Sequence, residues 1–154
     1  MQTLKGRFQR EDPLLLTSDE RASPHLVRST VDGRTVRMSL PRESELHGGD
    51  VLALEGDVAI VVRAAPEDLF VIEPHDALLW GIAGFQLGNL HRPVRFTDTA
   101  MLTPADAMVA DVLNRLNIRY ARQTIPFEGR RYGSFTGHSH GAGNHRHDHD
   151  HHAH

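Results

Sequence analysis

Short stretches of alternating apolar and polar residues, separated by turn residues, fill the first half of the chain. Asp32-Gly33 is a hairpin signal, and apolar residues alternate after it over 36–40. Two further Gly-Asp turns precede the apolar runs 51–54 and 58–62. Short strands at this spacing, without a helical period, predict a small all-β domain over residues 1–67.

Helical periodicity begins in the second half. A β-rich run at 69–72 is closed by Pro74, and apolar residues then recur at intervals of three and four over 75–87. Gly88-Asn89 is a stop signal for this helix, and 94–96 forms a short predicted strand. The pattern therefore predicts one helix between two strands.

Two glycines, Gly81 and Gly84, lie inside this predicted helix. Each disfavours the helix by about 1 kcal/mol relative to alanine. Small residues three positions apart would allow a second helix to approach closely. The glycines thus suggest a contact that the helix makes with another helix.

A second helix has a stronger start signal. Thr103 is expected to cap it, Pro104 to occupy its first position and Asp106 to complete a capping-box pattern. An apolar stripe follows, and Asn117 can adopt the left-handed conformation that ends a helix. The expected helix begins directly after Thr103.

A last predicted strand covers 118–125. The order strand, helix, strand, helix, strand fits a ferredoxin-like α+β domain over 68–136 if one more short strand forms near 99–102. The fold class is therefore α+β: a small all-β domain, a ferredoxin-like α+β domain and a tail at 137–154.

The tail is rich in histidine. Eight of the twelve histidines of the 154-residue chain lie in it, spaced by small and polar residues. Such a segment cannot bury enough apolar surface to order itself, so a disordered tail that binds divalent metal is expected. The tail metal ligands predicted are His138, His140, His145, His147, His149, His151, His152 and His154.

Two other interpretations of the tail are open: a purification tag, and a solvated segment without a role. A tag is usually an uninterrupted histidine run, whereas Asp148 and Asp150 interrupt this one. Imidazole binds nickel, zinc, copper and iron, and affinity follows the Irving–Williams series. The tail alone therefore does not select the metal.

Composition excludes several classes of protein. No cysteine is present, so disulfides, thiolate metal sites and cysteine nucleophiles are excluded. The formal charge of −3 gives no basic field for nucleic acid. The N-terminal residues lack the apolar core of a signal peptide, and no apolar run approaches the ~20 residues that span a membrane. A cytoplasmic protein is expected.

Outside the tail the histidines are few, and their spacing matches no zincin, zinc-finger or deaminase pattern. His25, His47 and His75 are more often structural or solvent-facing than ligands in such contexts. One His91 cannot hold a metal ion by itself. If the helix before it forms a two-fold interface, however, two copies of His91 meet at the axis, and a tail can supply further ligands.

The stretch Phe85-Gln86-Leu87-Gly88-Asn89-Leu90-His91-Arg92-Pro93 resembles the signature of the UreE family of urease accessory proteins, which are nickel metallochaperones. Support comes from the segments 63–67, 111–113 and 125–128, the two-part layout and the histidine-rich terminus. The tail is weakly specific alone, but the joint occurrence in this order is specific. The resemblance covers nearly the whole chain.

This resemblance implies an N-terminal domain akin to peptide-binding chaperone modules and a C-terminal domain that forms a homodimer. The sequence does not decide between a dimer and a metal-linked tetramer. His91 matches the interfacial ligand of Ni(II), which is the cargo, and Zn(II) or Cu(II) can compete for it. The implied partners are the urease accessory GTPase, the other urease accessory proteins and apo-urease. Neither an enzymatic activity nor binding to nucleic acid or membrane is expected.

The chain departs from the family pattern in two places. Some members carry a pair of histidines, two apart, where this chain has Ala105 and Ala107, so an accessory site is not expected. Leu90 stands where arginine is common, which removes a charge beside His91. Two other functions stay open: a Ni or Zn storage protein without a delivery partner, and a peptide-binding module with a metal-dependent switch.

Overall fold

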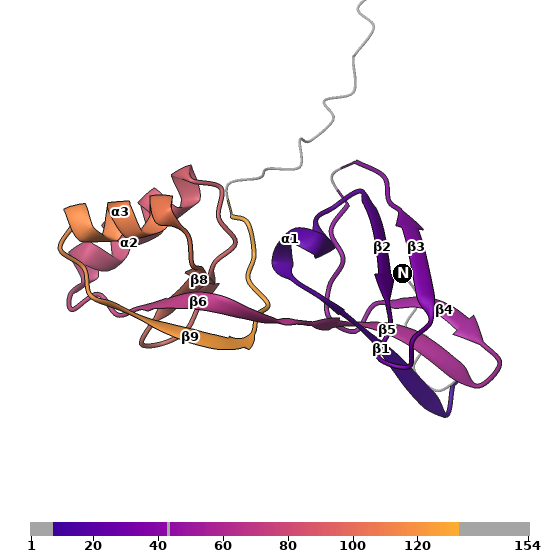
Figure 1. Ribbon diagram of the computed structural model, residues 1–154. Helices are drawn as coiled ribbons and strands as arrows, with labels where there is room; N and C mark the ends of the chain where they lie inside the picture. Colours follow the sequence, from indigo (N-terminus) through magenta and orange to yellow (C-terminus); the bar gives the residue numbers. More distant parts are fainter. Residues whose placement is uncertain (1–7, 43, 133–154) are drawn as a thin grey trace, which may run out of the picture.

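The computed structural model describes residues 8–42 and 44–132, which form two domains that lie side by side (Figure 1). The first domain contains five strands and one short helix, and the second contains four strands and two helices. No helix of the described residues is long and apolar enough to cross a membrane.

In the N-terminal domain a three-stranded sheet packs against a two-stranded hairpin. The sheet has the order β1-β5-β4, with β1 parallel to β5, and the hairpin pairs β2 with β3. Its elements are β1 (Arg10–Leu16), α1 (Ser18–Arg21), β2 (His25–Ser29), β3 (Thr35–Ser39), β4 (Val51–Glu55) and β5 (Val58–Ala64). The predicted all-β character is confirmed, apart from the four-residue helix α1, which the sequence pattern missed.

The predicted turns of this domain are present. Gly33, Gly49 and Gly56 have φ angles of +90°, +94° and +64°, which glycine adopts without strain. One core joins the sheet to the hairpin. Its buried members are Leu14, Leu16, Leu46, Ile60 and Val62, and the partly buried Leu26, Val36, Met38, Leu40 and Leu52 pack against them.

The C-terminal domain has the predicted ferredoxin-like topology. Its antiparallel sheet has the order β7-β8-β6-β9, and both helices lie on one face of that sheet (Figure 1). The elements are β6 (Pro66–Ile72), α2 (Ala77–Asn89), β7 (Arg95–Phe96), β8 (Met101–Pro104), α3 (Ala107–Arg115) and β9 (Tyr120–Pro126). The additional strand expected near 99–102 is β8.

The predicted start of α3 is wrong. Thr103 and Pro104 belong to β8, and the helix begins at Ala107 with Asp106 as its cap. The Asp106 carboxylate accepts a hydrogen bond from Val109 N at 2.9 Å. Thr103 is fully buried and its hydroxyl donates to the Pro93 carbonyl at 3.0 Å. Thr103 therefore satisfies a buried carbonyl between two segments of the domain instead of capping a helix.

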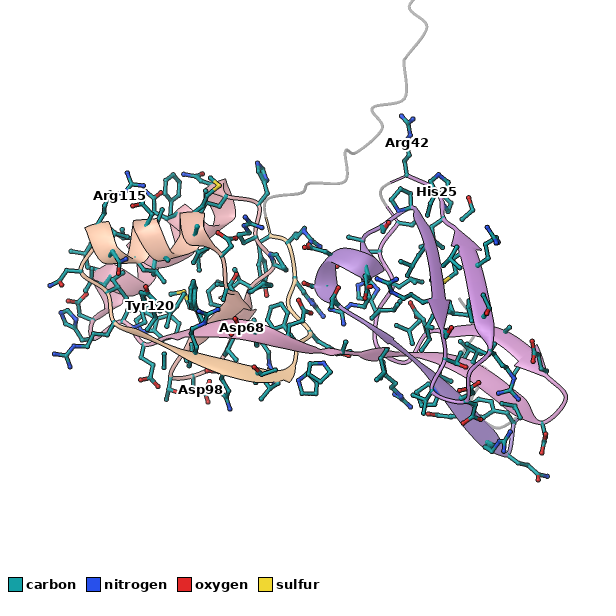
Figure 2. All side chains as sticks on the ribbon, viewed as in Figure 1. His25, Arg42, Asp68, Asp98, Arg115 and Tyr120 are labelled. Atoms are coloured by element: carbon teal, nitrogen blue, oxygen red, sulfur yellow. The ribbon has the colours of Figure 1, made fainter. Side chains whose placement is uncertain are left out.

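The helices cover one face of the C-terminal sheet, and the opposite face is covered only in part. Arg115 lies on the outer side of the helical layer, whereas Asp98 lies beyond the opposite face of the sheet (Figure 2). Phe70 and Ile72 pack beneath the helices. Leu69, one position away on the same strand, points to the other face, where Phe127 from the segment after β9 covers it.

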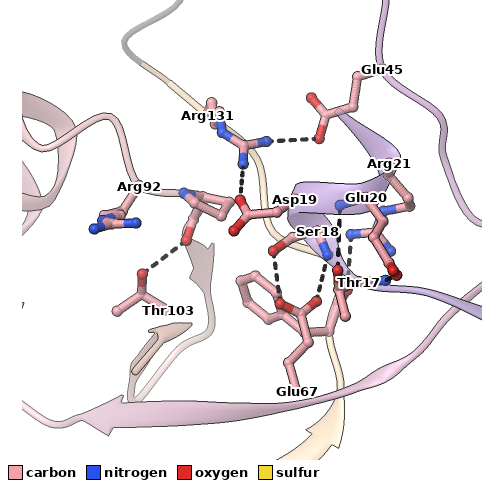
Figure 3. A network of polar contacts seen from close by, with 12 residues as sticks. Thr17, Ser18, Asp19, Glu20, Arg21, Glu45, Glu67, Arg92, Thr103 and Arg131 are labelled. Carbon is pink, nitrogen blue, oxygen red and sulfur yellow. Dashed lines mark hydrogen bonds and ion pairs between the residues drawn. The ribbon is translucent and has the colours of Figure 1, made fainter. Parts of the chain in front are cut away.

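Helix α1 joins the two domains (Figure 3). Ser18 donates from its backbone N and its hydroxyl to the Glu67 carboxylate, at 2.7 and 2.8 Å. Arg21 is buried and donates to the Phe127 carbonyl at 3.0 Å. Arg131 donates to Asp19 at 2.9 Å. Hydrogen bonds between three residue pairs thus hold the start of β6 and the segment after β9 against the N-terminal domain.

Candidate metal-binding site

His91 lies two positions after the end of α2, where the helix is closed by a Schellman motif. Its backbone N–H donates to the Gly88 carbonyl at 2.9 Å, and the Arg92 N–H donates to the Leu87 carbonyl at 3.2 Å. The predicted stop at Gly88-Asn89 is therefore slightly early: both residues belong to the last turn, and the chain reverses at His91.

The backbone of His91 is left-handed, with φ +53°. Asn117 has the same φ at the same position after α3, as predicted, and it closes an equivalent Schellman motif. Glycine, and less often asparagine, is the usual residue there. For residues with a larger side chain, the left-handed conformation is less favourable by about 1–2 kcal/mol. Histidine is uncommon at this position. Residues with strained backbone conformations are concentrated at functional sites.

The neighbours of His91 in sequence are fixed, whereas His91 itself is exposed. Leu90 packs against the core beneath the helices. Arg92 forms an ion pair of 2.5 Å with Asp106, the cap of α3. The backbone on both sides of His91 is thus held in place, while its imidazole is exposed to solvent. A ligand of an exchangeable metal ion must be accessible in this way.

Helix α2, which leads to His91, is apolar on two sides. Its inner side buries Ala83 and Leu87 in the core. Its outer side exposes Leu78 by 72% and Phe85 by 67%, seven residues and so two turns apart. A helix that is apolar all round is normally buried. The outer side of α2 is therefore an exposed apolar surface in the described chain.

The segment after β9 returns to the neighbourhood of His91. Val94 and Arg130 exchange two backbone hydrogen bonds, of 2.8 and 2.9 Å, in an isolated antiparallel bridge. Tyr132 stacks edge-on against Phe96, with ring centroids 5.4 Å apart. The sequence pattern missed both contacts, because a single bridge and one aromatic pair produce no periodic signal.

The other histidines of the described chain do not gather around His91. The His25 ring contacts the Ser39 hydroxyl at 3.3 Å, and the His75 ring contacts the Asp76 carboxylate at 3.2 Å. His75 precedes α2, whose cap is Asp76. His47 donates only a backbone hydrogen bond, to Asp50. Within residues 8–42 and 44–132, no group of three or more potential ligands could hold a metal ion.

The predicted tail ligands lie outside the described residues, which end at Tyr132. They are His138, His140, His145, His147, His149, His151, His152 and His154. In the described chain, His91 is thus the single member of the predicted ligand set, and its two-fold pairing and tail ligands remain predictions.

Two family models match the chain. The N-terminal domain of UreE urease accessory protein matches residues 2–65, and the C-terminal domain of the same protein matches residues 67–154. The chain belongs to the UreE family.

Among its relatives, the UreE urease accessory proteins of Burkholderia vietnamiensis and Ralstonia nicotianae are each 34% identical to this chain, over 86% of its length. That of Deinococcus radiodurans is 38% identical over 64% of the chain. The matched region covers 66%, 63% and 64% of these three UreE proteins, respectively, which is less than two thirds of their length.

Proposed function

We propose that this UreE protein is a non-catalytic nickel metallochaperone that acts in the cytoplasm. It binds Ni(II) between two copies of His91 in a homodimer and delivers the ion to apo-urease during urease maturation. Its partners are the urease accessory GTPase and the other urease accessory proteins. One observation carries the proposal: an exposed histidine, held in a strained backbone conformation, ends a helix whose outer side is apolar.

The outer side of α2 supports the proposed dimer. Leu78 and Phe85 are large apolar residues that the described chain leaves exposed on the helix leading to His91. Two-fold packing through this side would bury both residues and bring each residue near the axis close to its own copy. His91, two positions beyond the end of α2, would then lie near His91 of the second chain.

The glycines of α2 support the same interface. A Cβ atom built on Gly81 or Gly88 meets no atom within 4 Å. Alanine would therefore fit in the isolated chain and would favour the helix by about 1 kcal/mol at each position. The glycines are thus not required by the packing of the described chain, whereas a closely approaching second helix would need them.

The chemistry of the ligands supports transient binding. Two imidazoles from the His91 pair leave coordination positions for further nitrogen ligands, which the tail can supply at histidines 138–154. Imidazole binds nickel well but also binds zinc and copper, so Zn(II) and Cu(II) compete for the same site. A solvent-accessible ion held partly by a tail can be transferred to a partner.

Calorimetric titration with Ni(II) tests the site. His91→Ala is expected to abolish the tightest binding event while the protein stays folded, because that event needs the histidine pair. The 1–137 truncation is expected to lower the nickel stoichiometry but to retain about one tight ion per dimer, as a site on the two-fold axis requires.

The opposite pattern would contradict the proposal. If His91→Ala binds nickel as the unmodified chain does and the truncation binds none, the tail is the whole site and the protein is a metal store. Co-purification of the chain with the urease accessory GTPase distinguishes delivery from storage, since a store needs no partner.

A further inference from the structure

Residues 127–132, which we call the crossing segment, connect β9 to the tail. Strand β9 lies at one edge of the C-terminal sheet and β7 at the other. The bridge at Arg130 joins the segment to Val94, immediately before β7. The segment therefore passes across the width of four strands, about 14 Å, before the tail begins.

Contacts hold the crossing segment along its length. Phe127 is fully buried against the outer face of the sheet, and its carbonyl accepts a hydrogen bond from the buried Arg21. The Val94 bridge fixes the backbone of Arg130. Tyr132 then stacks on Phe96, which lies 3.9 Å from the position of a Cβ on Gly84 of α2.

The crossing brings the start of the tail within reach of His91. Val94 is three positions after His91, and Arg130 faces Val94, so His91 and Arg130 are at most about 17 Å apart. His138 is eight residues beyond Arg130 and can extend about 26 Å from it. Without the crossing segment, the tail would begin at the β9 edge, and its first residues would be used to cross the sheet before they could approach His91.

Building on the proposed function, we propose that the crossing segment is a positioning element for nickel binding. The Val94–Arg130 bridge and the Phe96–Tyr132 stack hold the chain that leads to the tail against the segment that follows His91, so the tail histidines would reach the bound ion at high effective concentration. Neither Arg130 nor Tyr132 touches the metal.

Substitution of Arg130 tests this role in the full chain. Arg130→Pro removes the N–H that donates to the Val94 carbonyl, whereas Arg130→Ala keeps it and is the matched control. We expect Arg130→Pro to weaken the tightest Ni(II) event about tenfold, as loss of a ligand-orienting contact does, with unchanged stoichiometry. Arg130→Ala should bind as the unmodified chain does.

The 1–137 truncation separates positioning from folding. In that background Arg130→Pro should leave the affinity of the remaining site unchanged, because no tail is left to position. If Arg130→Pro leaves the Ni(II) affinity of the full chain unchanged, the proposal is overturned. It is also overturned if Arg130→Pro lowers the affinity of the truncated chain as much as that of the full chain. If Arg130→Pro fails to fold, Tyr132→Ala tests the same role, with Tyr132→Phe as the control that keeps the aromatic ring. Equal Ni(II) affinity of these two variants would overturn the proposal.

Failure of the proposed function gives a different result. His91→Ala would then keep the tight event, whatever the Arg130 variants do. A different result is loss of the tight event in His91→Ala with unchanged Ni(II) affinity in Arg130→Pro. It would support the nickel site at His91 and overturn only the positioning role of the crossing segment.

Discussion

Among single residues, His91 combines a proposed role as a metal ligand with a left-handed backbone conformation that residues other than glycine rarely adopt. Asn117 closes α3 in the same way, and the sequence predicted its left-handed conformation because asparagine is common there. The conformation of His91 was not predictable in the same way, since histidine is not a usual residue at this position. Under the proposed function, the nickel-binding imidazole of His91, and not its backbone preference, accounts for histidine at this position.

Replacement of His91 by glycine separates these two properties. Glycine adopts φ +53° without strain, so the free energy of unfolding of the metal-free protein should stay equal or rise by up to about 1 kcal/mol. The tight nickel event should disappear. Urea denaturation and calorimetric titration measure the two effects.

Asn117→Gly is the matched control for this experiment. It should change stability in the same direction and leave nickel binding intact. A clear loss of stability in His91→Gly would contradict the assignment of strain to this residue.

Asp12 is a second residue with a defined electrostatic role. It is fully buried and accepts hydrogen bonds from Thr30 Oγ1 at 2.7 Å and Asp32 N at 3.0 Å, and it forms an ion pair with Arg34. Burial alone would raise the pKa of this carboxyl, but the three donors outweigh burial and the pKa is lowered. The carboxylate thus fixes β1 to the hairpin turn.

A lowered pKa links Asp12 to acid stability. Its contribution is fully present above the ordinary aspartate pKa of about 3.9 and is lost as the pH falls through the lower folded value. Asp12→Asn should therefore reduce the melting temperature by several degrees at neutral pH and by progressively less at acid pH. Thermal melts across a pH series measure this, and a deficit that is constant with pH would contradict it.

At the scale of elements, the periodicity of apolar residues predicted the existence of both helices but not their starts. The signal at Thr103 and Pro104 fits a helix cap locally, yet those residues are needed as β8, which pairs with β6. Pairing between segments far apart in sequence overrode the local preference. Asp106, three residues later, is an equally good cap.

Helix α2 carries the prediction about assembly. Leu78→Lys with Phe85→Lys places two charges on its exposed apolar side, and burial of unpaired charge in an interface is strongly unfavourable. The double variant should sediment as a monomer at concentrations where the unmodified chain is a dimer. Analytical ultracentrifugation measures this.

Val31→Lys is the control for these charges, because Val31 is 63% exposed in the N-terminal domain, away from α2. It should leave the sedimentation behaviour unchanged. A double variant that remains dimeric would place the interface elsewhere.

At the scale of the whole molecule, the sequence predicted a β-rich part followed by a ferredoxin-like part. It did not predict how the two parts are joined, because the joining contacts connect residues distant in sequence. Arg21 and Phe127 are 106 positions apart, and Ser18 and Glu67 are 49 apart. No local pattern marks such pairs, whereas turn residues and periodicity mark the elements themselves.

Loss of Arg21 should weaken the coupling between the domains. Arg21→Ala leaves the Phe127 carbonyl without its buried donor, and such a loss typically destabilises by about 1–3 kcal/mol. Calorimetry should show a lower melting temperature and a transition that broadens or divides, because each domain has its own core. A single sharp transition at the original temperature would contradict this role.

Under the proposed function, two chains share one nickel ion through His91. Native mass spectrometry of the full chain, loaded with half an equivalent of Ni(II) per chain, measures this sharing. We expect a dimer that carries about one nickel ion, and a His91→Ala dimer that does not hold it under the same conditions. A nickel-bound monomer, or a His91→Ala dimer that retains the ion, would show that His91 does not join two chains around the metal.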